Sequence, residues 1–328
     1  MEIVIDERIE LITVVQTICN YWENLQMKYY NEPLCPNKYR ENVQEYFGKY
    51  KEHKIVTLYN ALCGDIEDIT AFLNMALCCS NPPEMDVIAD YEKNWGKINN
   101  TVFPYEEFID GLRQFYIDTD FKSFFNNNQN EYQNMLNNYG SKTELSVNTA
   151  FDYYGYNADN YTVILSSLPD DGSGFGVKLK TNKNEIKNYS IITPYGYKDN
   201  NYLFGPIQSK KDLLWHEIGH LTINDLTDDF MKQFDLSEKQ VPEIYVKNLY
   251  NSIELIINEY IIRAITIRLW EINNERELEE EFFECDIQAG FKHIKLLKDH
   301  IKNNYEAERK FVKDNSYKKL MEYVINLI

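Results

Sequence analysis

The residues best suited to chemistry form one pentapeptide, His216-Glu217-Ile218-Gly219-His220. On a helix, two histidines four positions apart lie on the same face, so both imidazoles can reach one metal ion. Zinc held in this way lowers the pKa of a bound water, and the glutamate beside the first histidine is placed to take its proton. The sequence therefore predicts one Zn²⁺ per chain, with His216 and His220 as ligands and Glu217 as catalytic base.

A catalytic zinc ion usually has a third protein ligand. The metzincin pattern would place Gly at position 223 and His at position 226, and Ile223 and Leu226 exclude that class. The third ligand is then expected to be a carboxylate from a later helix. A helix that continued past His220 would carry three nearby aspartates away from the metal: Asp225, Asp228 and Asp229.

Two glutamates in a later apolar segment are better candidates for the third ligand. Helical neighbours of Glu254 are mostly polar, whereas those of Glu259 are mostly apolar. A carboxylate on an apolar stripe is costly unless a metal or a cation neutralises it, which favours Glu259 and leaves Glu254 and the aspartates as alternatives. Arg263, one turn later, is expected either to pair with Glu259 or to stabilise an oxyanion.

Peptide hydrolysis also requires a group that stabilises the tetrahedral oxyanion. Tyr245 and Tyr260 are candidates for this role. His293 and His300 also follow the motif, but they are seven residues apart on a basic helix face and are expected at the surface.

The elements that must position these residues fall into three regions. Apolar residues recur at three- and four-residue steps from about residue 2 to 139, and again from 209 to 328, which predicts helices. Ser209 is a plausible N-cap of the motif helix. Between these regions, short β-branched or alternating runs predict strands at 161–165, 176–180 and 189–193, with a hairpin turn at 169–174.

The expected fold is thus predominantly helical α+β. It comprises a helical N-terminal region, 1–140, and a zincin-like region, 141–328, which together would form two domains or one continuous domain. An edge strand at 189–193 or 202–205 is the candidate for holding a substrate by strand addition. Residues 224–245 are expected to form a loop or extra helix, used either as a lid or as plain connecting structure.

Composition narrows the classes of function. The 328 residues carry 34 Lys and Arg against 52 Asp and Glu, and a net charge of −18 disfavours binding to nucleic acid. No apolar stretch is long enough to span a bilayer, and the acidic start of the chain differs from a signal peptide. We therefore expect a cytoplasmic location by default, or secretion after removal of a leader. Six scattered cysteines without a CxxC pair are expected to be buried thiols.

The motif HEIGH followed by the segment NEYIIRA, residues 258–264, resembles the bacterial family called domain of unknown function 4932. The similarity extends to residues 10–12, 46–53 and 121–132. Members of that family resemble gluzincin metallopeptidases, and the resemblance implies the same assignment: two histidine ligands, Glu217 as base and Glu259 as third ligand. The 38 residues between His220 and Glu259 exceed the spacing in thermolysin-like enzymes.

The function expected from these features is zinc-dependent hydrolysis of a peptide or protein substrate. One alternative is a catalytically inactive zincin-like protein that binds a peptide in its cleft. Another is a structural zinc site closed by a fourth ligand, either Asp225, Asp229 or a cysteine.

Overall fold

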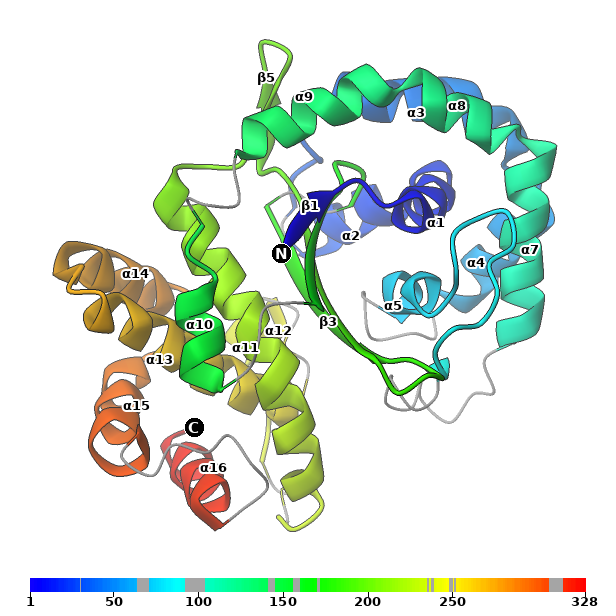
Figure 1. Cartoon of the computed structure of the whole chain (residues 1–328). Helices are drawn as coiled ribbons and strands as arrows, with labels where there is room; N and C mark the ends of the chain where they lie inside the picture. The colour runs from blue at the N-terminus through cyan, green and yellow to red at the C-terminus, as the bar shows by residue number, and fades with distance from the viewer. Residues whose placement is uncertain are drawn as a thin grey trace. The chain divides into compact units, whose positions relative to one another are not determined.

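The computed structural model describes residues 1–29, 31–63, 71–91, 104–140, 145–155, 160–169, 172–234, 236, 239–247, 250, 252–306 and 315–328. The chain divides into two compact units, each drawn in Figure 1. The first comprises Met1–Glu144 and Asn160–Gly205, and the second comprises Leu145–Asp159 and Pro206–Ile328. The sheet therefore belongs with the N-terminal helices, whereas the sequence predicts it in the same region as the HEIGH motif.

The first unit is built around α1 (Glu7–Ile18), in which every residue from Arg8 to Ile18 is buried. Its polar side chains are satisfied internally: Gln16 donates to the Tyr59 hydroxyl and accepts from the Trp22 indole, and Thr13 donates to the Ile9 carbonyl. In Figure 1, α1 lies inside an arc of later helices. The helices of this unit that follow α1 are α2 (Tyr21–Tyr29), α3 (Lys38–Phe47), η1 (Gly48–Tyr50), α4 (Lys54–Leu62), α5 (Ala71–Leu77), α7 (Tyr105–Asp118), α8 (Phe121–Asn127) and α9 (Gln129–Tyr139).

A four-stranded mixed sheet completes the core of the first unit. Its order is β1-β2-β4-β3, with β1 parallel to β2, β2 parallel to β4, and β3 antiparallel to β4. All three predicted strands are confirmed, but the start of the chain, expected to be helical, supplies the fourth. The strands are β1 (Glu2–Val4), β2 (Tyr161–Leu165), β3 (Gly174–Lys180) and β4 (Ile186–Ile192).

The hairpin predicted at residues 169–174 is wrong, because β2 and β3 are not neighbours; residues 170 and 171 lie outside the described part of the chain. The hairpin of this sheet joins β3 to β4 through Thr181–Glu185. There the backbone N–H of Thr181 donates to the Glu185 carbonyl at 2.9 Å, and Asn184 takes the left-handed conformation at φ 63°.

The strand at 189–193 cannot hold a substrate by strand addition as predicted. It belongs to β4, whose backbone pairs with β2 on one side and β3 on the other, so no free edge remains. The other candidate, 202–205, overlaps β6 (Asn201–Leu203), which pairs with β5 (Gly196–Lys198) in a separate two-stranded sheet.

The second unit is helical in its described residues. Its longest helix, α11, begins after Pro206, three residues before the predicted N-cap at Ser209, and it carries the HEIGH motif. Residues 224–231, the start of the segment expected to form a loop or an extra helix, continue α11 instead, and α12 is an extra helix within that segment. The elements are α10 (Asn148–Tyr154), α11 (Ile207–Met231), α12 (Glu243–Lys247), α13 (Ile253–Ile272), α14 (Arg276–Gln288), α15 (Ile294–His300), η3 (Ile301–Tyr305) and α16 (Asn315–Leu327).

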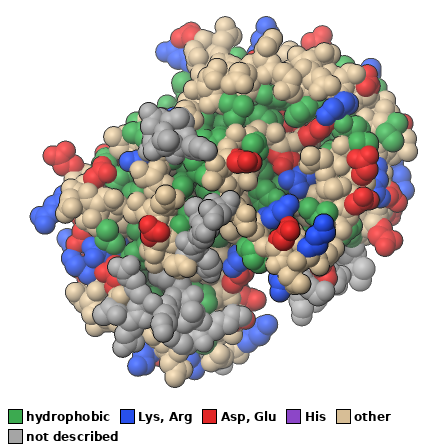
Figure 2. Space-filling model, in the orientation of Figure 1, with side chains coloured by type: hydrophobic (Ala, Val, Ile, Leu, Met, Phe, Trp, Pro, Cys, Tyr) green, Lys and Arg blue, Asp and Glu red, His purple; other side chains and the backbone are tan. Residues whose placement is uncertain are grey.

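The predominantly helical α+β fold predicted from the sequence is confirmed. None of the described helices is long and apolar enough to cross a membrane. On the face drawn in Figure 2, acidic and basic side chains are interspersed. Cys78 and Cys79 are buried as expected, whereas Cys19, Cys35 and Cys63 are half-buried and Cys285 is exposed.

Candidate metal centre

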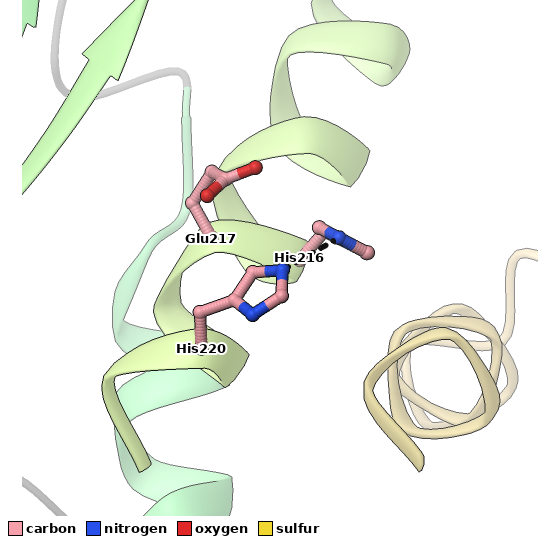
Figure 3. Close-up of side chains that lie close together, drawn as sticks. All are labelled: His216, Glu217 and His220. Atoms are coloured by element: carbon pink, nitrogen blue, oxygen red, sulfur yellow. Dashed lines mark hydrogen bonds between the residues drawn. The ribbon is translucent and has the colours of Figure 1, made fainter. Parts of the chain in front are cut away.

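The middle of α11 presents the two histidines of the motif side by side (Figure 3). Their Nε2 atoms are 3.1 Å apart, and Glu217 follows the first histidine as a buried side chain, 4% exposed. One imidazole nitrogen from each histidine and a carboxylate oxygen of Glu217 all lie within 4.8 Å of one another. Spacing on a single helix therefore brings together the three residues predicted from the motif.

Helix α13 brings Glu259 to the same two imidazoles. Its Oε1 lies 3.2 Å from Nε2 of His220, and its Oε2 lies 3.6 Å from Nε2 of His216. Only 5% of Glu259 is exposed, so a simple surface pair with Arg263 does not describe it. The third ligand expected from the apolar surroundings is thus the glutamate that faces the histidines.

The alternative ligands lie elsewhere on these helices. Asp225, Asp228 and Asp229 are exposed in the last turns of α11. Partial burial and the charge of Asp228 raise the pKa of Glu254, which places this glutamate beside the end of α11 and away from the motif. These four carboxylates are not part of the histidine cluster.

The spacing of the ligand atoms fits a zinc site. The two Nε2 atoms are 3.1 Å apart, Oε1 of Glu259 lies 3.2 Å from Nε2 of His220, and Oε2 of Glu259 lies 3.6 Å from Nε2 of His216. Ligands at the usual zinc distances of roughly 2.0–2.1 Å lie about 3.3–3.4 Å from each other at the corners of a tetrahedron. Two imidazoles and one carboxylate are also the donors that zinc accepts, so the residues fit this ion.

Charges within the cluster shift the pKa values of Glu259 and His220. Burial raises the pKa of Glu259, but the charges of His216 and Arg263 outweigh burial and hold it well below its usual range. Burial lowers the pKa of His220, yet the hydrogen bond and the charge of Glu259 raise it to about 9. Glu259 is therefore ionised, and its charge stabilises the protonated form of His220 when no metal is bound.

Asn224, which the sequence analysis missed, orients the second histidine. Its Oδ1 lies 3.0 Å from Nδ1 of His220 and can accept a hydrogen bond from that nitrogen, which leaves the lone pair of Nε2 available to a metal ion. The signal was present in the sequence: Asn224 lies four residues after His220, on the same helical face.

Arg263 is surrounded by partners. Its Nε donates to Oε2 of Glu259 at 2.9 Å, its Nη1 to Asp286 at 2.5 Å, and its Nη2 to the Tyr250 hydroxyl at 3.0 Å. The guanidinium also lies over the Phe291 ring, 4.6 Å from its centroid. Of the two roles expected for Arg263, these contacts match pairing with Glu259.

The two tyrosines predicted as oxyanion donors bond to each other. The hydroxyl of Tyr245 lies 2.9 Å from that of Tyr260 and 3.1 Å from the Gly290 carbonyl oxygen, and both rings pack on Phe291. His293 is exposed, as expected, whereas His300 is half-buried and stacks on Tyr323.

A family model described as "Domain of unknown function (DUF4932)" matches residues 1–328. No curated protein and no solved structure matches the chain.

Proposed function

The chain belongs to the DUF4932 family over its whole length, and we propose that it is a zinc-dependent metallopeptidase of the gluzincin type. The observation that carries the proposal is the close approach of three ligand residues: the Nε2 atoms of His216 and His220 are 3.1 Å apart, and each lies 3.2–3.6 Å from a carboxylate oxygen of Glu259. A pair of histidines one turn apart, a glutamate between them and a second glutamate from a later helix is the arrangement typical of zinc peptidases.

A catalytic site is favoured over a structural one because the three protein ligands leave a coordination position open. Among the described residues, the only cluster of His, Cys, Asp and Glu that could hold a metal is that of His216, Glu217 and His220, joined by Glu259 from α13. The aspartates suggested as a fourth ligand are exposed in the last turns of the helix.

Each residue of the site would have a separate role in the proposed hydrolysis. Zinc bound here would supply a Lewis acid that polarises a substrate carbonyl and makes water acidic enough to lose a proton near neutral pH. Glu217, within 4.8 Å of the imidazole nitrogens, would accept that proton and then deliver it to the leaving amine. Asn224 and Arg263 would hold His220 and Glu259 in place.

The first test is the metal content of the purified chain, measured by elemental mass spectrometry after preparation without added metal. We expect about one zinc per wild-type chain. Zinc binding should be lost or much weaker in His216→Ala and in Glu259→Gln. Glu254→Gln is the matched control, because it removes a carboxylate from the same helix at a position away from the histidines.

Each result has a direct consequence. A wild type without metal, even after zinc is supplied, would overturn the proposal. If Glu259→Gln retains zinc and Glu254→Gln does not, the third ligand would be Glu254 rather than Glu259.

A library of peptides then separates catalysis from binding. Cleavage that a hydroxamate inhibits supports the peptidase, since a hydroxamate needs an open coordination position. A peptide that binds to the zinc-loaded protein without being cut would favour the inactive binding protein instead.

A further inference from the structure

Glu259 is the first member of a charged hydrogen-bond network that extends through Arg263 to the next helix, α14. Its Oε2 accepts from Nε of Arg263, and Nη1 of the same guanidinium donates to Asp286 of α14. We call Glu259, Arg263 and Asp286 the carboxylate bridge. Asp286 is 7% exposed, and its pKa is raised by burial, with the Arg263 charge acting in the opposite direction.

The second carboxylate of the bridge, Asp286, offsets the positive charge that Arg263 places beside Glu259. An arginine paired only with Glu259 would cancel the negative charge that a metal ion needs from this ligand. Asp286 supplies a second carboxylate, so Glu259, Arg263 and Asp286 together carry a net charge of −1. The ligand therefore keeps its attraction for a cation while the guanidinium fixes its orientation.

The guanidinium itself has a single orientation. Nη2 donates to Tyr250 at 3.0 Å, and the plane of the group lies over Phe291 at 4.6 Å. An arginine held at all three nitrogens presents Nε to one oxygen only, Oε2 of Glu259. The other oxygen, Oε1, lies 3.2 Å from Nε2 of His220, and Oε2 itself lies 3.6 Å from Nε2 of His216.

We infer that Arg263 and Asp286 are positioning residues of the metal centre: they fix the orientation of the Glu259 carboxylate towards the two imidazoles and preserve its negative charge. This inference rests on the proposed zinc site. Groups that bond to a metal ligand in this way commonly change metal affinity about 10- to 100-fold when they are replaced.

The test is the affinity for Zn²⁺ in competition with a chromophoric chelator, using Arg263→Lys and Asp286→Asn. Lysine keeps the charge, but its compact ammonium lacks the planar fork with which the guanidinium reaches three separate partners. Asparagine keeps the shape but removes a charge. Both should bind zinc about 10- to 100-fold more weakly than wild type. Arg268→Lys is the matched control: Arg268 lies on the same helix and pairs with Glu271 and Glu306.

Cobalt provides a readout that folding alone would not change. Co²⁺ in place of zinc absorbs visible light according to the geometry of its ligands, so Arg263→Lys and Asp286→Asn should shift the bands of the folded protein. Arg268→Lys should leave them unchanged. If Arg263→Lys does not fold, Asp286→Asn carries the test by itself.

The outcomes separate the inference from the proposed function. Wild-type affinity and an unchanged cobalt spectrum in both variants would overturn the positioning role and leave the zinc site intact. A wild type that binds neither metal would overturn the site and the inference together. Weak zinc binding confined to the two bridge variants would support both.

Discussion

Gly219 of α11 lies so close to Ile262 of α13 that a Cβ at position 219 would be 2.8 Å from Cγ2 of Ile262. The Tyr154 hydroxyl would be equally close to that atom. Because Glu259 is one turn before Ile262, the missing side chain allows α13 to bring this glutamate against the histidines. The glycine inside HEIGH thus serves the packing that completes the site.

Gly219→Ala should therefore weaken both the fold and the metal centre. Overpacking costs roughly 1–3 kcal/mol, and the better helix propensity of alanine offsets about 0.5–1 kcal/mol of it. Chemical denaturation and zinc content would measure the two effects. Gly48→Ala is the control, since a Cβ at Gly48 meets no atom within 4 Å. Equal stability and zinc content in the two variants would contradict the packing role.

Glu217→Gln should keep its zinc and lose hydrolysis. The amide matches the carboxylate in size but cannot accept a proton from water, and loss of a general base commonly lowers rates about 10²- to 10⁴-fold. The measurement is the rate of cleavage of a peptide found in the library screen, together with zinc content. Glu254→Gln should cleave at the wild-type rate. Full activity in Glu217→Gln would rule out the proposed base.

Asn224→Ala should reduce zinc affinity without removing a ligand. Without the Oδ1 atom at 3.0 Å from Nδ1, His220 loses the partner that fixes its ring and its tautomer. We expect binding about 10- to 100-fold weaker in a chelator competition. Asp228→Asn, an exposed change on the same helix, should bind zinc like wild type. Affinity unchanged in Asn224→Ala would show that the ring is held by its metal alone.

Glu10, in the first unit, should make stability depend on pH. Its carboxylate is fully buried and accepts from the Tyr39 hydroxyl at 2.6 Å and from Ser166 at 2.8 Å. Burial raises its pKa from 4.5 to about 7. The folded state therefore holds this proton more tightly than the unfolded chain does.

The resulting contribution to stability is fully present below pH 4.5 and is lost as pH rises through about 7. Its size is on the order of 3 kcal/mol. Glu10→Gln should remove this slope and be more stable than wild type at pH 8, as measured by denaturation at pH 5 and 8. Glu41→Gln, an exposed change on α3, should keep the wild-type slope. A wild-type slope in Glu10→Gln would show that other groups cause it.

Several features of the fold depended on partners that local patterns do not identify. The three strand segments were predictable because β-branched and alternating runs are local signals. Their order was not, because β2 pairs with β1 from the start of the chain and with β4, which is more distant in sequence than β3. The same long-range pairing places the sheet in the first unit and closes both edges of β4.

The sequence by itself determined the helical α+β class, the spacing of His216, Glu217 and His220 on one helix, and the preference for Glu259 over Glu254. These follow from helical periodicity and from the cost of a carboxylate on an apolar face. Only the tertiary structure decided how α13 meets α11 and that Asp286 of α14 completes the charge of Arg263. Both depend on contacts between helices that are distant in sequence, and such contacts are fixed by packing rather than by local pattern.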